Sequence, residues 1–495
     1  MKKTVLIFIA LCTFHLTISI AMSAIAHSSF MAEYHNGQGL WNFSLDSFNY
    51  HRQALDSYEM LSNGEYLKWW NTDFYRHTDY IGLMYFLIYP SPVSFAPINA
   101  VAWALSVISI YLISMFLCQK DQRLSGIVAI IFGLWPSNLL HATQLLRDPF
   151  FNLGVLLLIL GWVAMLNGHR KIVYSFMAAG GIILSETIRA ESLWLLLFCS
   201  FLATGTIILW KRQAALNALL ALGLVGLFYN YPAITAQAGE TKSVSENSND
   251  NFDEAEKIEA VKKQLKASLG AEYSPELDKN ISTWFVSHHV WDFETRKNRL
   301  LVLAGEHKNG LNAFLTKWLK PWKTTSWLPA IIEHQLFSAN GYRNGFVVWY
   351  LEPGTSLIDS NVIFRSINDV VAYIPRALMI GFCAPFPSHW FSTGKTGGRA
   401  IRALGGMEMF AWYILMAGFV IFLINSPVPV YIKTWLIIFM IIMILPLGLF
   451  VPNLGTLFRM RFIYMAPILI GGGYGIMTLL KTYIFKDTKP AHTYD

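Results

Sequence analysis

The sequence predicts an all-α polytopic membrane protein with about 10–12 transmembrane helices, each built from roughly 20 apolar residues. Of its 495 residues, 54% are hydrophobic and only 14% are charged. Aromatic side chains are abundant, with 17 Trp, 22 Tyr and 34 Phe. Apolar runs long enough to cross a hydrocarbon core of about 30 Å recur along the chain. This combination excludes a soluble globular domain, which could not remain in solution with such a composition.

The predicted membrane helices are 4–26, 94–117, 124–140, 149–167, 172–188, 192–210, 214–233, 407–425, 431–451 and 462–481. The first follows Lys2 and Lys3 and ends in "AIA", features that it shares with a signal peptide. Its apolar run is longer than a usual signal core, which favours a retained helix over a cleaved one. In both cases the next segment lies on the far side of the membrane.

Short connections between these helices differ in charge, which predicts the orientation of the chain. "CQKDQR", "NGHRK" and "LWKRQ" are basic, whereas "LLRD" and "TIRAES" carry both signs. The positive-inside rule places the basic connections in the cytoplasm. The first loop, 27–93, and a large segment between the seventh and eighth helices then face outward. We therefore expect an N-terminal membrane domain (1–233), an outer domain (234–406), and C-terminal helices with a cytoplasmic tail (407–495).

Within the outer domain, the segment 370–391 ("VVAYIPRALMIGFCAPFPSHWF") is apolar enough to span the membrane. It contains Pro375 and Arg376. Proline interrupts a helix, and an arginine is costly in a lipid core. We therefore predict that this segment lies at the interface or re-enters the membrane. A full span is the alternative, and the total number of helices depends on it.

The cysteines predict neither a disulfide framework nor a zinc site, because Cys12, Cys118, Cys199 and Cys383 all lie in or beside apolar runs without a CxxC spacing. We expect no nucleic-acid partner, since the chain has no basic groove interleaved with aromatic residues. Little charge lies within the predicted helices and no internal repeat is evident, which disfavours a transporter.

Polar residues from four separate segments are predicted to meet at the outer face. In the first loop, "DSFNYHRQAL" places Asp46 and Tyr50 about one turn apart if the segment is helical, with His51 next to them. Asp46 is the first candidate for a general base, a carboxylate that takes a proton from an acceptor hydroxyl. The alternative is an amphipathic helix beside the membrane with solvated acids.

The turn "HATQLLRDPFF" contains an adjacent Arg147 and Asp148. Because Asp148 precedes Pro149, a residue suited to the first helical turn, the sequence predicts Asp148 as the N-cap of the next helix. Arg147 has no comparable structural explanation. It is therefore the stronger candidate for binding a ligand.

Arginines mark the two remaining segments. In "SETIRAES", Arg189 lies one helical turn from Glu186 and is expected either to pair with it or to bind an anion. In "NLGTLFRMRF", Arg459 and Arg461 begin the final helix on the outer side, against the inward bias of positive charge. Since arginine binds phosphate through two parallel hydrogen bonds, these residues predict an anionic ligand.

The order of these features resembles the GT-C superfamily of integral-membrane glycosyltransferases. The resemblance rests on an N-terminal helix, the "DSFNYHRQAL" loop, the "PSNLLHATQLLRDP" hairpin, a large late outer domain and a closing "NLGTLFRMRF" helix. Within the superfamily, the chain is similar to bacterial relatives of the protein O-mannosyltransferases and the lipid A aminoarabinose transferases. The "YIPRALMIGFCAPFPSHW" segment resembles polysaccharide-biosynthesis membrane proteins of the same general type. One difference is that the family's first loop often has an acidic pair, whereas Asp46 is followed by Ser47.

The resemblance implies an inverting glycosyltransferase of the bacterial cytoplasmic membrane, with its active site facing the periplasm. A sugar would pass from a polyprenyl-phosphate-linked donor to an acceptor lipid, glycan or protein. Asp46 would be the catalytic base, and no cofactor is expected, with a divalent metal as the alternative. Substrate binding would fall to Arg147, Asp148, Arg189, Arg459, Arg461, Tyr50 and His51.

Two other functions agree with many of the same features. A polysaccharide polymerase or ligase would use polyprenyl-diphosphate-linked oligosaccharides and would also need many helices, a large outer segment and outward arginines. A lipid or glycan transporter is the second alternative. The polymerase or ligase differs from the proposed glycosyltransferase in its lipid-linked donor. The transporter differs from both because it catalyses no sugar transfer.

Overall fold

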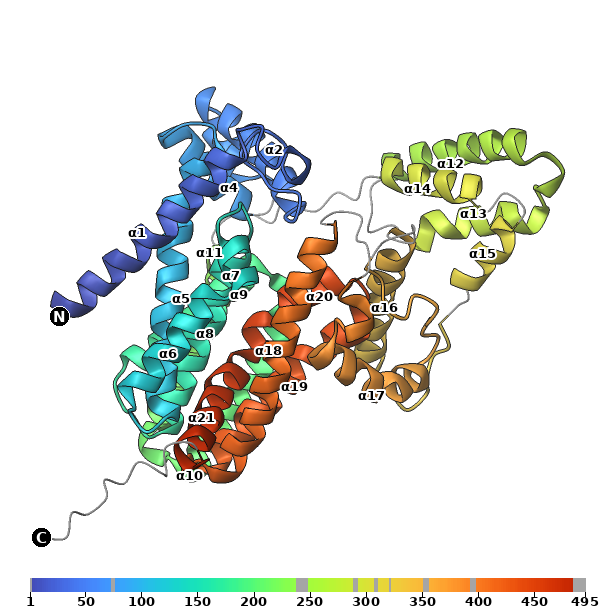
Figure 1. The fold of residues 1–495 in the computed structure, drawn as a ribbon. Coiled ribbons are helices and arrows are strands. Elements are labelled where there is room, and N and C mark those ends of the chain that lie inside the picture. Colours follow the sequence, from blue (N-terminus) through green and yellow to red (C-terminus); the bar gives the residue numbers. More distant parts are fainter. Residues whose placement is uncertain are drawn as a thin grey trace, which may run out of the picture. The chain divides into compact units, whose positions relative to one another are not determined.

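The computed structural model describes residues 2–72, 76–236, 248–287, 293–306, 310–319, 322–349, 356–391 and 398–483. Within these ranges the secondary structure is helical, with two isolated β-bridges and no sheet (Figure 1). The predicted all-α class is therefore confirmed. The chain divides into two compact units, Met1–Thr235 with Phe382–Ile444 and Phe458–Asp495, and Ala236–Gly381 with Leu445–Leu457.

Eight helical stretches among the described residues are long and apolar enough to cross a membrane, which confirms the prediction of a multi-pass membrane protein. They are Val5–Ile25, Pro92–Leu117, Asp148–Leu166, Ala190–Trp210, Arg212–Tyr229, Arg399–Asn425, Val430–Phe450 and Leu454–Thr482. The helices that form them are α1 (Lys2–Ile25), α5 (Ala96–Leu117), α8 (Asp148–Leu166), α10 (Leu193–Trp210), α11 (Ala215–Ala236), α18 (Gly398–Asn425), α19 (Val430–Phe450), α20 (Leu454–Arg461) and α21 (Ala466–Tyr483).

Two of the predicted spans differ from continuous, full-length helices. In place of 124–140, α6 (Gln122–Leu134) and α7 (Pro136–Ala142) are bent by 57° relative to each other. Pro136 lacks the N–H needed to continue α6, and it suits the first position of α7. α9 (Val173–Ile188) has only 16 residues. That length is about 24 Å, which is short of a hydrocarbon core of about 30 Å.

The number of full-length spans is therefore eight among the described residues, or nine if the bent pair counts as one span. This is fewer than the predicted range of about 10–12, because apolar composition alone does not reveal a helix that is too short or broken.

The turns between the membrane helices alternate between two ends of the first unit. The His169 ring in the α8–α9 turn lies 5.0 Å from the Phe116 ring of α5. Asp121, between α5 and α6, contacts Lys481 of α21 at 3.6 Å. The "LLRD" and "TIRAES" connections meet at the opposite end. The basic turns thus share one end of the helices, and the mixed-charge turns share the other.

α18 and α21 approach each other along a stripe of glycines. A Cβ atom built on Gly475 would overlap the carbonyl oxygen of Gly418, and one on Gly472 would overlap that of Leu415. Small residues let membrane helices pack closely by van der Waals contact. This close packing holds α21, the longer part of the last span, directly against α18.

Substitution of Gly475 by alanine is expected to force α18 and α21 apart. The cost should be about 1–3 kcal/mol, the usual range for overpacking. Gly205→Ala is the matched control, because a Cβ at that position meets nothing within 4 Å. The measurement is the midpoint of thermal unfolding of the purified protein in detergent. Equal midpoints for the two variants would show that the helix pair tolerates the added methyl group.

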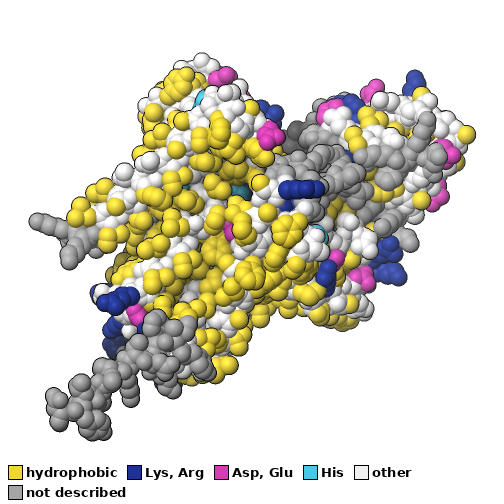
Figure 2. Space-filling model, in the orientation of Figure 1, with side chains coloured by type: hydrophobic (Ala, Val, Ile, Leu, Met, Phe, Trp, Pro, Cys, Tyr) yellow, Lys and Arg dark blue, Asp and Glu magenta, His cyan; other side chains and the backbone are white. Residues whose placement is uncertain are grey.

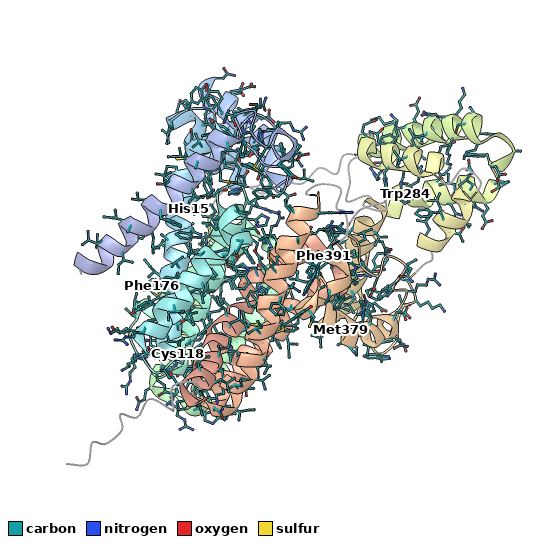
Figure 3. All side chains as sticks on the ribbon, in the orientation of Figure 1. His15, Cys118, Phe176, Trp284, Met379 and Phe391 are labelled. Atoms are coloured by element: carbon teal, nitrogen blue, oxygen red, sulfur yellow. The ribbon has the colours of Figure 1, made fainter. Side chains whose placement is uncertain are left out.

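The second unit contains two apolar cores. The first includes Leu265, Trp284 and Leu303 (Figure 3 labels Trp284). The second includes Phe364 and Val370. The helices of this unit are α12 (Ser248–Leu269), α13 (Pro275–Ser287), α14 (Phe293–Glu306), α15 (Leu311–Trp318), α16 (Ala330–Trp349) and most of α17 (Ile367–Cys383).

Beside the second core, Arg343 of α16 is buried with only 1% of its surface exposed. It donates hydrogen bonds to the carbonyl oxygens of Leu449 at 2.9 Å and Asp359 at 3.0 Å. Its guanidinium group also lies over the rings of Phe364 and Tyr373, 5.1 and 5.5 Å from their centroids. One side chain therefore holds together three separate stretches of this unit.

The predicted interfacial segment 370–391 begins within α17. This helix has 17 residues, includes Pro375, and is not among the eight candidate spans. Arg376 donates to both carboxylate oxygens of Asp359, at 2.9 and 3.0 Å. These hydrogen bonds hold the pKa of Asp359 below its usual value, against the opposing effect of burial. The charge of Arg376 is therefore balanced locally.

Candidate functional site

The first loop folds into a small helical layer at one end of the first unit. α2 (Asp46–Ser62) packs against α4 (Arg76–Leu87), and α3 (Tyr66–Trp70) lies between them in the sequence. Asp46 lies in the first turn of α2. A negative charge is favourable there, because the N-terminus of a helix carries a partial positive charge. About half of the Asp46 side chain, 45%, is exposed.

Four charged residues of this end form a chain of alternating sign. Asp46 Oδ2 lies 2.6 Å from Arg459 Nη2. Arg459 Nε lies 3.3 Å from Asp148 Oδ2, and Asp148 Oδ1 lies 2.5 Å from Arg189 Nη2. We call Asp46, Arg459, Asp148 and Arg189 the charge chain. Its members come from α2, α20, α8 and the residue that follows α9, so four separate segments meet here.

The position of Asp148 differs from the prediction that this residue is the N-cap of the next helix. α8 begins at Asp148 itself, with Arg147 preceding it as the N-cap residue, and no side chain caps the helix by a hydrogen bond. The buried carboxylate faces Arg189 and Arg459 instead of the N–H groups of its own helix. An ionised carboxylate gains more from two guanidinium groups in a buried site than from a neutral cap. The pair predicted between Arg189 and Glu186 is likewise replaced by the contact with Asp148.

Tyr50 and Arg147 lie next to the charge chain. The Arg147 guanidinium is 5.6 Å from the centre of the Tyr50 ring and donates to the carbonyl oxygen of Ile188 at 3.2 Å. Burial raises the pKa of Tyr50 to about 12, so its phenol stays neutral at physiological pH. Arg147 thus carries a positive charge that is held beside the site by an aromatic ring and a backbone carbonyl.

Two of the predicted residues lie apart from this group. Arg461 is buried with 1% exposure, and it contacts Met409 Sδ and the Phe458 ring. Residues two apart on a helix point about 200° from each other, so Arg459 and Arg461 cannot face one phosphate together. His51 hydrogen-bonds to the Tyr85 hydroxyl at 2.7 Å. The sequence predicts both Arg459 and Arg461 as phosphate ligands, but the structure places only Arg459 beside Asp46 and Asp148.

A small cavity of about 20 Å³, room for roughly one water molecule, opens beside the charge chain. Its polar lining includes Ser137, Asn138, His141, Asn152, Asp148 and Arg459. His141 Nδ1 lies 2.6 Å from the Ser137 carbonyl oxygen, which can only accept. This contact assigns the proton to Nδ1 and makes Nε2 a hydrogen-bond acceptor.

Sequence reasoning missed His141 and Asn138, although their spacing places both on one face of α7. It also missed Glu408 of α18, a buried carboxylate that accepts a hydrogen bond from the Ser137 N–H at 2.6 Å. The available signal was an acid within the apolar run "GGMEMFAWYILM". Ionisable residues in such runs are rare and need a partner.

The donor set at this site suits an anion better than a metal. In the described part of the chain, no group of three or more His, Cys, Asp or Glu side chains is arranged to hold a metal ion. Arg459 lies between Asp46 and Asp148 and contacts both carboxylates. A divalent cation could bridge them only if this guanidinium group moved away.

Three buried N–H donors of the charge chain have no hydrogen-bond acceptor among the described residues. They are Nε and Nη1 of Arg189 and Nε of Arg459, which is close to Asp148 but outside hydrogen-bond geometry. Leaving a buried charged donor unsatisfied is costly. An anion with several acceptor oxygens would remove that cost.

These features define a multi-pass membrane protein with a buried, arginine-rich polar site at one end of its helices. No protein-family model, no curated protein and no solved structure matches the chain.

Proposed function

We propose that this chain is a membrane glycosyltransferase of GT-C type that moves a sugar from a polyprenyl-phosphate donor to an acceptor hydroxyl. The observation that carries the proposal is the set of unsatisfied N–H donors on Arg189 and Arg459. A phosphate group offers acceptor oxygens in the geometry that arginine prefers. The surrounding apolar helices offer a surface for the lipid chain of the donor.

In the proposed reaction, the acceptor hydroxyl gives its proton to Asp46 as its oxygen forms a bond to the anomeric carbon of the donor. The bond from that carbon to the phosphate oxygen breaks, and its electron pair stays on the phosphate. Arg459 and Arg189 offset the negative charge that develops there. A single displacement of this kind inverts the configuration at the anomeric carbon.

Arg459 links the general base Asp46 to the binding of the donor phosphate. It holds Asp46 at 2.6 Å while its Nε has no hydrogen-bond acceptor. A donor phosphate that binds Arg459 would compete with Asp46 for the same guanidinium group. Phosphate binding would thereby release the carboxylate from Arg459, so that it can accept a hydrogen bond from the acceptor hydroxyl.

The test is a transfer assay with the full-length protein in liposomes. One set of reactions offers polyprenyl-phosphate sugars, and a second offers polyprenyl-diphosphate oligosaccharides. Turnover with the first set is expected. Turnover only with the second would replace the proposal by a polymerase or ligase, and movement of lipid across the bilayer without transfer would favour a transporter.

Asp46→Asn is expected to lower transfer by at least about 100-fold, the lower range for loss of a general base. Asp56→Asn is the matched control, because Asp56 is an exposed acid on the same helix α2. The measurement is the initial rate at saturating donor, together with the amount of folded protein recovered. Near-normal transfer by Asp46→Asn would remove Asp46 from the role of base.

A further inference from the structure

A group of cations lies at the end of the first unit opposite the charge chain. Three turns meet there, 118–121 after α5, 167–172 after α8, and 211–214 after α10. The Arg170 guanidinium donates to the side-chain oxygen of Gln213, which ties the second turn to the third. Figure 2 shows Lys and Arg side chains gathered at the lower-left end of this unit, among hydrophobic ones.

Lys120 and Lys171 each lie close enough to His169 for their charges to act on its imidazole. Burial lowers the pKa of His169, and the charges of Lys120 and Lys171 lower it further. The nearby acid, Asp121, accepts hydrogen bonds from two N–H groups at the start of α6 and contacts Lys481 at 3.6 Å. Among the described residues, no carboxylate forms an ion pair with Lys120 or Lys171. The group has an excess of positive charge.

The backbone of the turn 118–121 is strained at Gln119 and Lys120. Gln119 and Lys120 have φ angles of 56° and 64°, in the left-handed region that non-glycine residues rarely adopt. The Gln119 side chain donates to the Tyr474 hydroxyl at 3.0 Å, which anchors the turn to α21. Strain of this kind persists where the surrounding structure requires it and is frequent at binding sites.

An apolar surface begins directly after the cations. Ile172, Val173 and Phe176 are exposed by 57%, 43% and 55% (Figure 3 labels Phe176). The ring of His169 itself packs edge-on against Phe116 and Tyr174, 5.0 and 5.9 Å away. A cationic group next to exposed apolar side chains matches an amphipathic ligand, with an anionic head and a hydrocarbon tail.

We propose that Lys120, His169 and Lys171 bind the phosphate of an anionic phospholipid whose acyl chain lies along Ile172, Val173 and Phe176. The phosphate would balance the cations at this end of α5 and α8. Since an anion favours the protonated imidazole, lipid binding would raise the pKa of His169 and take up a proton. The affinity for the lipid would then increase as the pH falls from about 8 to about 6.

The experiment measures binding of phosphatidylglycerol to the delipidated full-length protein by native mass spectrometry, with phosphatidylcholine as the neutral lipid. The double variant Lys120→Gln/Lys171→Gln is expected to lose about 25-fold in affinity, at roughly fivefold per lysine. The control is Arg123→Gln/Arg212→Gln, which removes two exposed charges near the same end of the unit. This control should lose no more than a few-fold. Equal losses in the two double variants would overturn the proposal.

Two further measurements separate a lipid site from a simple phosphate site and from general charge. Inorganic phosphate should compete with the lipid only weakly, because it lacks the acyl chain; competition at equal concentration would overturn the role of the apolar surface. His169→Gln should bind the lipid with an affinity that no longer depends on pH in this range. An unchanged pH dependence would exclude His169 from the site.

Discussion

Replacing Arg459 by glutamine is expected to abolish sugar transfer and to destabilise the first unit. Arg459 contacts both Asp46 and Asp148, and only 19% of its side chain is exposed. Removing one partner of a buried ion pair costs about 3–5 kcal/mol, because the other charge stays buried. The loss should fall toward the lower value, since Asp148 keeps Arg189 and Asp46 is half exposed.

Three companion variants separate stability from catalysis at this position. Arg459→Lys keeps the charge but loses the planar guanidinium group that contacts two carboxylates. We therefore expect a large fall in the rate of transfer and only a small fall in the midpoint of thermal unfolding. Arg52→Gln removes an exposed arginine of α2 and serves as the control. The double variant Asp46→Asn/Arg459→Gln should be less destabilised than the sum of the two single changes. Wild-type transfer by Arg459→Gln would contradict the assignment of Arg459 to the donor phosphate.

Replacing Arg343 by methionine is expected to produce the largest loss of stability in the second unit. Methionine has a similar volume, but it leaves the carbonyl oxygens of Leu449 and Asp359 without the donor described above. Losing these charged hydrogen bonds and the contacts with two aromatic rings should cost about 3–5 kcal/mol. The measurement is limited proteolysis of the full-length protein, which reports opening of this unit without a need for substrate.

Lys263→Met is the matched control for that experiment, because Lys263 is exposed on α12 of the same unit. It removes the same charge and introduces the same side chain, and we expect cleavage at the wild-type rate. Arg343→Lys should restore only part of the protection, since one ammonium group cannot reach both carbonyl oxygens with the geometry of a guanidinium. A wild-type cleavage rate for Arg343→Met would show that this arginine does not hold the unit together.

Much of the membrane fold was predictable because hydropathy is a direct physical requirement of a lipid core. The residues of the charge chain were also predictable as a group, since alternating turns place "LLRD", "TIRAES" and the start of the last helix at one end. Asp46 and Arg459 meet although 413 positions separate them. The alternation of basic and mixed-charge turns was enough to predict that these segments share one end of the helices.

The finer features depend on rotation and packing, which composition does not encode. The "RMR" motif does not show that Arg459 and Arg461 point in different directions. The apparent N-cap at Asp148 was misleading, because the stronger electrostatic partners come from distant segments. The boundary of the second unit could not be predicted either, since the unit includes Leu445–Leu457, which lie outside the predicted outer domain 234–406.

The hydrogen bond between Glu408 and the Ser137 N–H has a mechanical consequence for the proposed site. α7 is a separate short helix, bent by 57° from α6 at Pro136, so α6 alone does not determine its direction. The carboxylate of α18 secures its first turn, while Asn138 and His141 of the same helix line the cavity. When α18 moves, α7 and the cavity wall that it forms should therefore move with it. A displacement of the late membrane helices would then change the volume of the cavity beside Asp148.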